Sequence, residues 1–236
     1  MKELRVLIRE RLDLIEMGST YVNKMQKYLE LMNIKLRNVI SQIHGTSGLC
    51  VIKAILEGER NPDRLLLLCH DSIIKAKGDD VKKALEGNYK EQYLLLLKEN
   101  LRLWEEHQTS IKQIEHAIAN LLEEMNQGNK DIEVTSKSKP TRHHNPAIPG
   151  LHETMVQMYG GINLTSICGI NDCTMLRLLG EVGNDMSRFP SVKHFVSWVG
   201  LSPKKQTKWK DEKTRQLQIQ YCRTYLSAIG SKFNEQ

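Results

Sequence analysis

Residues 89–125 of the chain read YKEQYLLLLKENLRLWEEHQTSIKQIEHAIANLLEEM. Apolar side chains occupy every seventh position of this stretch from Leu97 onward, namely Leu97, Trp104, Ile111, Ile118 and Met125. A companion column of apolar residues begins at Leu101, four positions after Leu97. About halfway along, its spacing shifts to three positions, so that Ile114 follows Ile111 and Leu121 follows Ile118. A seven-residue recurrence keeps one side of an α-helix apolar, and such a shift accommodates the 3.6 residues of each helical turn. The stretch therefore predicts one long helix whose apolar side packs against another helix.

A second seven-residue recurrence lies near the start of the chain. Its apolar column is Ile8, Ile15, Val22, Leu29, Leu36 and Ile43, with Met25, Met32 and Val39 three positions after members of the column. Gly18 weakens the middle of this stretch, because glycine disfavours helix interiors. We infer two long helices. Pairing of these helices within one chain is the default expectation, and pairing with a second copy in a homodimer is the alternative.

The segment 128–149, GNKDIEVTSKSKPTRHHNPAIP, separates these helices from the rest of the chain. It is polar, carries three of the six prolines and has no apolar periodicity, which is typical of a linker. His143 and His144 are adjacent and would not face one metal ion from the same helix side, so we expect no metal site there. Residues 45–88 contain shorter helical pieces, and no convincing strand pattern occurs.

Overall composition excludes several classes of protein. The chain has 236 residues, of which 40% are hydrophobic and 26% charged, as in a globular protein of one or two domains. No run approaches the roughly 18 apolar residues of a membrane span, and Met1 leads into charged residues rather than an apolar signal core. We expect a cytoplasmic protein that does not bind membranes. Its five cysteines include no C-x-x-C pair, and we expect reduced thiols.

The positive charge is concentrated at one end of the chain. Residues 193–236 hold nine basic and three acidic side chains, which accounts for the whole net charge of +6. Such an excess can attract a polyanion, because neutralised phosphates release condensed counterions. A solvated tail without a ligand explains the composition equally well.

The stretch LTSICGINDCTMLRLLGEVG, residues 164–183, predicts a helix-hairpin-helix-like unit. A short helix would end at Ile167, turn through residues 168–171 and enter a second helix. Free N–H groups at a helix start suit an anion, and glycine lets a phosphate approach the backbone. Asn171 stands where such motifs often have a second glycine and tolerates left-handed backbone. Asp172 would place a carboxylate near the phosphate, unless it caps the helix.

Further candidate contacts follow this motif. Pro190 can begin another helix, with Lys193 turned outward. Trp198 fits the apolar core of that helix, with base stacking as the alternative, while Trp209 stands among lysines and could stack on a base. The predicted DNA-binding residues are Gly169, Ile170, Asn171, Arg177, Lys193, Lys204, Lys205 and Lys208.

We therefore predict an all-α fold. A long coiled-coil-like helical hairpin domain spans residues 1–127, a linker spans 128–149, and a small helix-hairpin-helix-like domain spans 150–203. A basic tail follows over residues 204–236.

Residues 164–203, LTSICGINDCTMLRLLGEVGNDMSRFPSVKHFVSWVGLSP, resemble the C-terminal domain of insertion-sequence-110 family transposases. The resemblance lies in the apolar-Gly turn, the Glu-x-Gly, the Arg-Phe-Pro-Ser and the final Gly-Leu-x-Pro. The stretches 21–65 and 83–92 resemble the coiled-coil middle part of one branch of this family. Altogether the resemblance covers about residues 3–203.

This resemblance implies recombination of DNA, guided in studied members by a structured RNA. Members of the family carry a RuvC-like N-terminal domain with an acidic tetrad that binds magnesium, and a serine nucleophile in the C-terminal domain. The match begins downstream of the RuvC-like domain, so we expect no acidic tetrad and no cofactor in this chain. The serine belongs to a Ser-Gly stretch, but residues 204–212 read KKQTKWKDE here. Codons for Ser-Gly-Lys-Met, read out of frame after an A, would give the sequence of residues 208–212, so a frameshifted tail is one hypothesis.

Three functions are consistent with these features. The leading hypothesis is a DNA-binding fragment of an insertion-sequence transposase, inactive alone, whose partners are DNA, guide RNA and a second copy or a full-length transposase. The alternatives are an all-helical nucleic-acid-binding adaptor and a helical oligomerisation module, both without a role in recombination. The sequence assigns no catalytic residue and no metal ligand, so enzymatic activity is left open.

Overall fold

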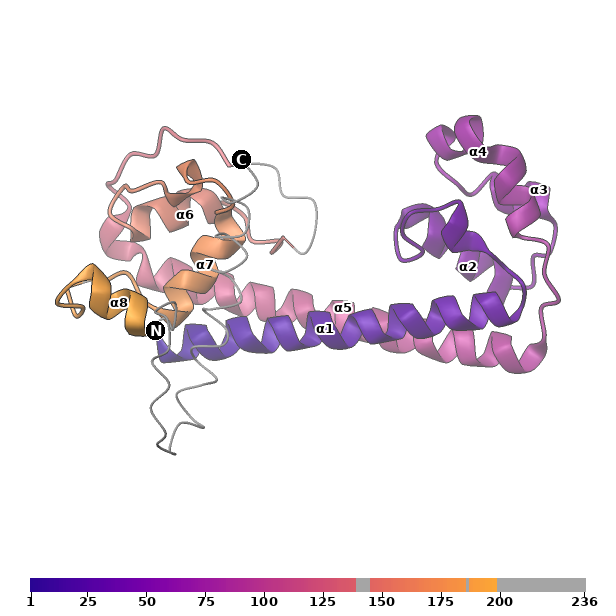
Figure 1. Cartoon of the computed structure of the whole chain (residues 1–236), viewed down its shortest axis with the longest axis horizontal. Helices are drawn as coiled ribbons and strands as arrows, with labels where there is room; N and C mark the ends of the chain where they lie inside the picture. The colour runs from indigo at the N-terminus through magenta and orange to yellow at the C-terminus, as the bar shows by residue number, and fades with distance from the viewer. Residues whose placement is uncertain (139–144, 186, 199–236) are drawn as a thin grey trace. The chain divides into compact units, whose positions relative to one another are not determined.

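The computed structural model describes residues 1–138, 145–185 and 187–198, which form α-helices, short 3-10 turns and no strand (Figure 1). The predicted all-α class is confirmed. The chain divides into two compact units, a terminal unit (Met1–Arg11 and Lys112–Gln236) and a central unit (Leu12–Ile111). The division falls inside the two long helices, and the domain boundaries expected at residues 127 and 149 stay a prediction.

Both long helices expected from the seven-residue columns are present. They are α1 (Lys2–Leu31) and α5 (Glu91–Met125). The second agrees closely with the predicted range 89–125. The first ends at Leu31, so the expectation that its helical pattern continues through Ile43 is wrong.

Asn33 ends α1 because its backbone is left-handed, with φ of 62°. The N–H of Asn33 donates to the carbonyl of Glu30 and the N–H of Ile34 donates to the carbonyl of Leu29, each over 2.9 Å. This pair of bonds is a Schellman motif, in which a left-handed residue closes the last turn of the helix. Ile34 and Leu29 are both buried, which supplies the apolar contact that accompanies such an ending.

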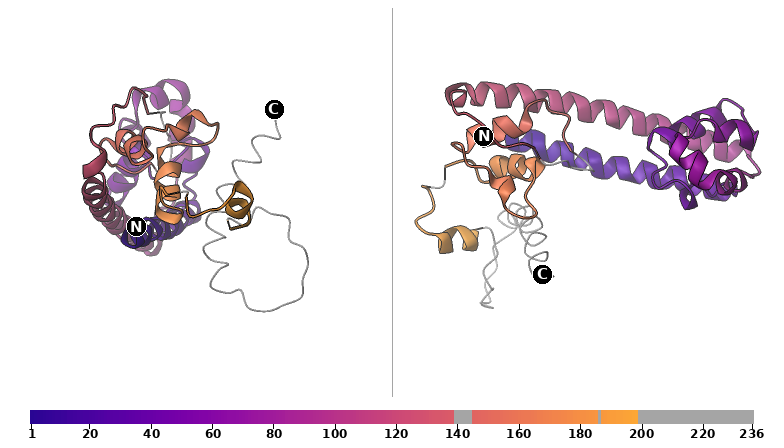
Figure 2. Two further views of the ribbon diagram at one scale, coloured as in Figure 1. Left: turned by 90° about the vertical axis from the view of Figure 1, so that its left-hand side faces the viewer. Right: turned by 90° about the horizontal axis from the view of Figure 1, so that it is seen from above.

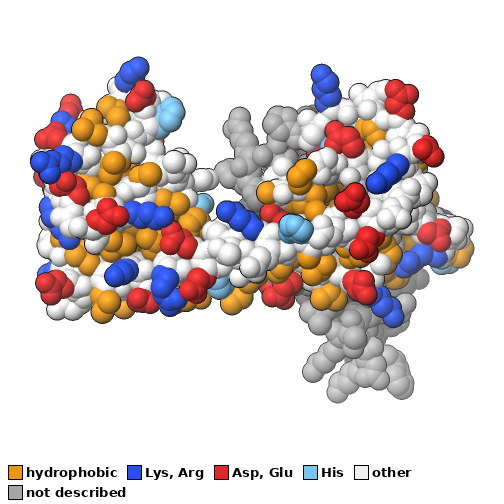
Figure 3. Space-filling view, turned by 180° about the vertical axis from the view of Figure 1, so that it is seen from behind, with side chains coloured by type: hydrophobic (Ala, Val, Ile, Leu, Met, Phe, Trp, Pro, Cys, Tyr) orange, Lys and Arg blue, Asp and Glu red, His pale blue; other side chains and the backbone are white. Residues whose placement is uncertain are grey.

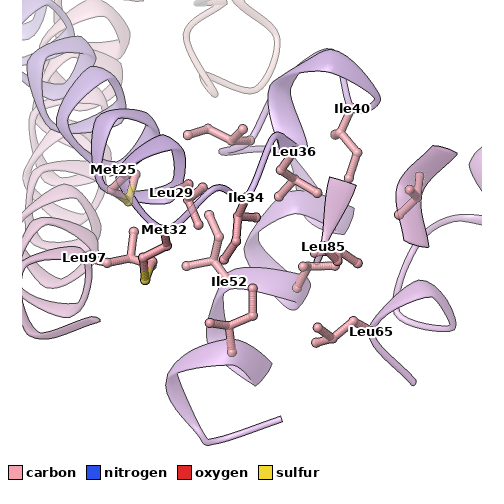
Figure 4. Packing of buried hydrophobic residues seen from close by; sticks show 14 of the residues in the cluster. Met25, Leu29, Met32, Ile34, Leu36, Ile40, Ile52, Leu65, Leu85 and Leu97 are labelled. Carbon is pink, nitrogen blue, oxygen red and sulfur yellow. The ribbon is translucent and has the colours of Figure 1, made fainter. Parts of the chain in front are cut away.

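The central unit packs three helices and a 3-10 turn beside the paired long helices. These elements are α2 (Thr46–Leu56), α3 (Pro62–Leu66), α4 (Asp71–Ala84) and the 3-10 turn η1 (Leu36–Asn38). Figure 4 shows Met25 and Leu29 of α1, and Met32 just after its end, close to Leu97 of α5 and to the side chains of the smaller helices. The apolar columns of α1 and α5 therefore meet within one chain, as the default expectation had it.

The terminal unit contains the remaining elements. They are the 3-10 turn η2 (Gln127–Asn129), α6 (Leu151–Met158), the 3-10 turn η3 (Leu164–Ser166), α7 (Asp172–Glu181) and α8 (Val192–Trp198). Helices α6 and α7 contact each other (Figure 1 and Figure 2). Burial of the Tyr159 ring raises the pKa of its hydroxyl, which donates to the carbonyl of Met175 over 3.2 Å. This bond connects the end of α6 to α7.

The end of α7 lies against the first turns of α1. A Cβ added at Gly180 would lie 2.8 Å from Cδ1 of Ile8, so a larger residue here would require the Ile8 side chain to shift. Arg5 donates to the carbonyls of Gly180 and Glu181, each over 2.9 Å, and Arg9 binds both carboxylate oxygens of Glu181 over 2.7 and 2.8 Å. Cations suit the negative end of a helix, so these arginines fix the position of α7.

Candidate nucleic-acid interface

The predicted glycine turn is present and open to solvent. Gly169 is exposed and has a φ of 84°, a left-handed conformation that favours glycine. The N–H of Ile170 donates to the carbonyl of Ile167 over 3.2 Å and closes the turn. Ile170 is 9% exposed and anchors the turn in the interior. The backbone at Gly169 is therefore accessible to a ligand.

Asn171 begins α7, but not through the left-handed conformation that the sequence suggested. Its φ of −126° and ψ of 175° are extended, and its side-chain oxygen accepts from the N–H of Thr174 over 2.9 Å. The same oxygen accepts from the Thr174 hydroxyl over 3.0 Å. Asn171 is thus the N-cap of the helix, and it occupies one of the N–H groups that the first turn leaves without helical acceptors.

The element before the turn is shorter than expected. Instead of an α-helix ending at Ile167, the chain forms the single 3-10 turn η3, whose N-cap is Asn163. The Asn163 side chain accepts from the N–H and the hydroxyl of Thr165, over 2.9 and 2.7 Å. Asparagine and threonine favour such local bonds over helix continuation. The helix-hairpin-helix assignment stays a prediction.

Asp172 is buried and does not cap α7. Its carboxylate is buried, accepts a hydrogen bond from the Ser138 hydroxyl and lies 2.6 Å from Nδ1 of His152. His152 belongs to α6 and is also buried. The expectation that Asp172 caps α7 is wrong, because Asn171 is the N-cap. Asp172 lies in the first turn of α7, and its nearness to a phosphate stays a prediction.

The described candidate residues do not gather at one place. Arg177 lies in the second half of α7, where burial lowers the pKa of its guanidinium and the positive charge of Arg11 acts in the same direction. Lys193 is exposed on α8, whose Phe195 and Trp198 pack with Val182 just past the end of α7. Since ten helical residues span about 15 Å, Lys193 belongs to the opposite end of α7 from the turn.

Trp198 occupies the apolar position that its spacing predicted. Its ring centroid lies 5.5 Å from that of Phe189, and both rings belong to the cluster around Val182. Such edge-to-face packing stabilises a small core. Trp198 is thus partly buried against this cluster, in agreement with its predicted packing, and its base-stacking alternative stays a prediction.

Several predicted contacts lie outside the described residues. These are Lys204, Lys205, Lys208 and Trp209; His143 and His144, where no metal site was expected, also lie outside the described residues. Within the described surface, Figure 3 shows basic and acidic side chains interspersed on the face that it presents. The charge excess of residues 193–236 falls almost wholly in the part that the structure leaves out.

The residues that the structure describes contain neither a metal-binding cluster nor a membrane-spanning helix. No group of three His, Cys, Asp or Glu side chains there could hold a metal ion. None of the helices in that part of the chain has the length and apolar character needed to cross a membrane. Its four cysteines are free thiols, of which Cys50 and Cys168 are exposed and Cys69 and Cys173 buried.

Sequence reasoning missed the polar residues that surround Asp172. Ser136, Ser138 and His152 lie between 16 and 34 positions apart from their partners in the network. Partners at such separations have no periodic signature. Only the fold brings them together.

Comparison with known proteins agrees with the resemblance in the C-terminal part of the chain. Residues 162–217 match the family described as transposase IS116/IS110/IS902 family. No curated protein matches the chain, and no solved structure does. The matched segment contains η3, the Gly169 turn, α7 and α8. Residues 162–217 are therefore similar to transposases of the IS116/IS110/IS902 family.

Proposed function

We propose that this chain is a DNA-binding part of an insertion-sequence transposase, and that the Gly169 turn contacts a backbone phosphate. The observation that carries the proposal is the position of this turn. It is exposed, left-handed and placed at the start of α7, inside the segment that matches the transposase family.

The chemistry of the turn supports an anionic ligand. The start of α7 carries partial positive charge, and the absence of a side chain at Gly169 lets an oxygen approach the backbone. The Asp172 carboxylate would oppose such a ligand if it faced solvent, but it is bound in the interior by His152 and Ser138. The inward turn of this carboxylate therefore favours anion binding.

Lys193, Lys204, Lys205 and Lys208 supply the remaining attraction in this proposal. Lys193 is exposed and lies near the far end of α7, so it would contact a different phosphate from the one at Gly169. Each neutralised phosphate adds to the salt dependence of binding. We therefore expect affinity for DNA to fall steeply as the salt concentration rises.

We further propose that the chain alone does not cleave DNA strands. Residues 204–212 read KKQTKWKDE where the family has its Ser-Gly stretch, so the family's nucleophile has no counterpart at that position. A nicking assay on element-end DNA with magnesium tests this proposal. Accumulation of nicked product in proportion to the added chain would contradict it.

Fluorescence anisotropy with a labelled duplex tests the DNA contact. Gly169→Glu together with Lys193→Glu should weaken binding at least about tenfold, because both changes oppose phosphate. Gly160→Glu is the matched control, since Gly160 is also exposed and left-handed, with φ of 66° and no atom within 4 Å of an added Cβ. Equal affinity of the double variant and the wild-type chain would refute the contact.

Partners beyond DNA also belong to the proposal. A preference for element-end DNA or for the element's structured RNA supports a transposase role, whereas sequence-indifferent binding supports a general adaptor. Association with a second copy or with full-length transposase is measured by pull-down and light scattering. An oligomer would have to use surfaces other than the Met25, Leu29 and Leu97 contacts, which are buried within one chain.

A further inference from the structure

Three side chains of the terminal unit form a continuous hydrogen-bonded series. The Ser136 hydroxyl oxygen lies 2.9 Å from Nε2 of His152, and Nδ1 of His152 lies 2.6 Å from Oδ1 of Asp172. Ser136 precedes α6, His152 belongs to its first turn, and Asp172 begins α7. A serine, a base and a carboxylate in this order form the arrangement that activates a hydroxyl nucleophile.

The two supporting groups are more deeply buried than the serine, as such chemistry requires. Ser136 is half-buried, whereas the side chains of His152 and Asp172 are only 2% and 6% exposed. The nucleophile therefore reaches the surface while the two supporting groups are enclosed. The Ser138 hydroxyl donates to the second oxygen of Asp172, which fixes the orientation of the carboxylate.

The Asp172 carboxylate also sets the roles of the two ring nitrogens. A carboxylate accepts hydrogen bonds, so Nδ1 of neutral His152 carries the proton and Nε2 is left to accept from the Ser136 hydroxyl. This places the acceptor nitrogen where it can remove the hydroxyl proton.

Two other serine–histidine pairs provide an internal comparison. The Ser191 hydroxyl lies 2.8 Å from Nδ1 of His194, and the Ser72 hydroxyl lies 2.9 Å from Nδ1 of His70. Both pairs are exposed, and among the described residues no carboxylate binds either histidine. Of these three pairs, the one at Ser136 has a buried histidine whose other ring nitrogen, Nδ1, is hydrogen-bonded to a carboxylate.

We propose that Ser136, His152 and Asp172 form a nucleophilic serine site for carboxylic esters. The Asp172 charge lies one histidine away from the nucleophile, so a neutral carbonyl group suits the site better than an anionic phosphodiester. The site is thus distinct from the proposed DNA contact and does not depend on it.

The reaction proceeds in two balanced steps. Oγ of Ser136 attacks the ester carbonyl carbon as its proton passes to Nε2 of His152, and the bond from that carbon to the alcohol oxygen breaks. His152 returns the proton to the departing alcohol, leaving acyl-Ser136. Water then gives a proton to His152 and attacks the acyl carbon, and Ser136 leaves and regains its proton. Asp172 stabilises the charged histidine in both steps.

A fluorophosphonate probe tests the proposal on the full chain. The probe phosphonylates activated serines. Peptide mapping by mass spectrometry locates each adduct and measures the rate at which it forms. A positioned general base contributes about 10²- to 10⁴-fold, so Ser136 should react at least about 100-fold faster than Ser191. Ser136→Ala should remove the adduct, while Ser191→Ala should leave it unchanged.

Asp172→Asn tests the role of the carboxylate and should slow labelling about 100-fold or more, because an amide favours the wrong histidine tautomer. Circular dichroism and the unfolding midpoint are measured for each variant. If Asp172→Asn does not fold, the comparison of Ser136 with Ser191 in the wild-type chain still decides. Equal labelling of these two serines, no adduct at Ser136, or an undiminished rate in folded Asp172→Asn would each overturn the proposal.

Discussion

Arg11 and Glu115 form an ion pair inside the terminal unit, with Nε and Oε1 2.7 Å apart and side chains only 4% and 7% exposed. The other oxygen of Glu115 accepts from the backbone N–H of Ala147 over 3.1 Å. One carboxylate thus connects the start of α1, the end of α5 and the segment before α6. Removing two charges from water is costly, so the pair requires both partners.

Breaking this pair from one side should destabilise the chain strongly. Arg11→Met leaves the Glu115 carboxylate buried without its cation, and we expect a loss of about 3–5 kcal/mol in the free energy of unfolding. Arg11→Met combined with Glu115→Leu should cost less than the sum of the two single changes, since it removes both charges. Urea denaturation of the four proteins checks the cycle. Additive losses would mean that the two residues do not interact.

The left-handed residue that ends α1 gives a second prediction. Asn33→Val should lose about 1–2 kcal/mol relative to Asn33→Gly, because a β-branched residue tolerates a φ of 62° poorly and glycine adopts it freely. Both variants lose the hydrogen bond from Asn33 to the carbonyl of Glu86, so the comparison isolates the backbone. Urea unfolding midpoints measure the difference. Equal midpoints would show that this conformation is not required.

Sequence periodicity predicted burial better than it predicted helix ends. Leu36 and Ile43 belong to the first apolar column and are 0% and 4% exposed, although α1 ends before them at Leu31. The seven-residue spacing of apolar residues therefore predicts which side chains are buried, whether or not the backbone there is helical. A helix end depends on one residue that accepts a left-handed backbone, and Asn33 is not distinctive enough in the sequence to be recognised.

The glycine turn shows a comparable limit of sequence reasoning. Gly169 and the start of α7 lie where the motif predicted, because local backbone preferences act over few residues. The orientation of Asp172 could not be predicted, since it depends on His152, twenty positions earlier in the chain. Contacts of that kind arise from packing.

Steric contact at Gly48 gives a third prediction. A Cβ at this position would lie 2.3 Å from the carbonyl oxygen of Ile43, which the fixed backbone cannot relieve. Gly48→Ala should therefore destabilise the chain by about 1–3 kcal/mol. Gly128→Ala is the control, because no atom lies within 4 Å of its Cβ. Thermal unfolding of both variants measures the contrast, and equal midpoints would argue against this packing of α2.

The exposed ion pair of Lys53 and Glu105 should contribute little and should respond to salt. Their Nζ and Oε1 atoms are 2.7 Å apart, but the side chains are 51% and 45% exposed. The hydrogen bond and the charge of Glu105 raise the pKa of Lys53. The contribution is therefore fully present below the ordinary lysine pKa of 10.5 and is lost only as the pH rises above it.

Lys53→Met should lower the free energy of unfolding by less than about 1 kcal/mol near neutral pH, because solvent screens the pair. The difference from wild type should shrink in 1 M salt, where the Debye length is about 3 Å. Urea titrations at two salt concentrations measure it. A loss that salt does not change would point to packing by the Lys53 stem instead of charge.

Alkylation of Cys168 provides a direct reading of the proposed DNA contact. Cys168 adjoins Gly169 and is exposed, and Cys50 is an exposed thiol of the central unit that serves as the reference. If a phosphate occupies the turn, saturating duplex DNA should slow iodoacetamide labelling of Cys168 several-fold and leave Cys50 unchanged. Cys222 lies outside the described residues and is replaced by serine to simplify the mass spectra. DNA bound at the Gly169 turn would shield the adjacent Cys168 thiol. Unchanged labelling of Cys168 at saturating DNA would therefore place the nucleic acid elsewhere on the chain.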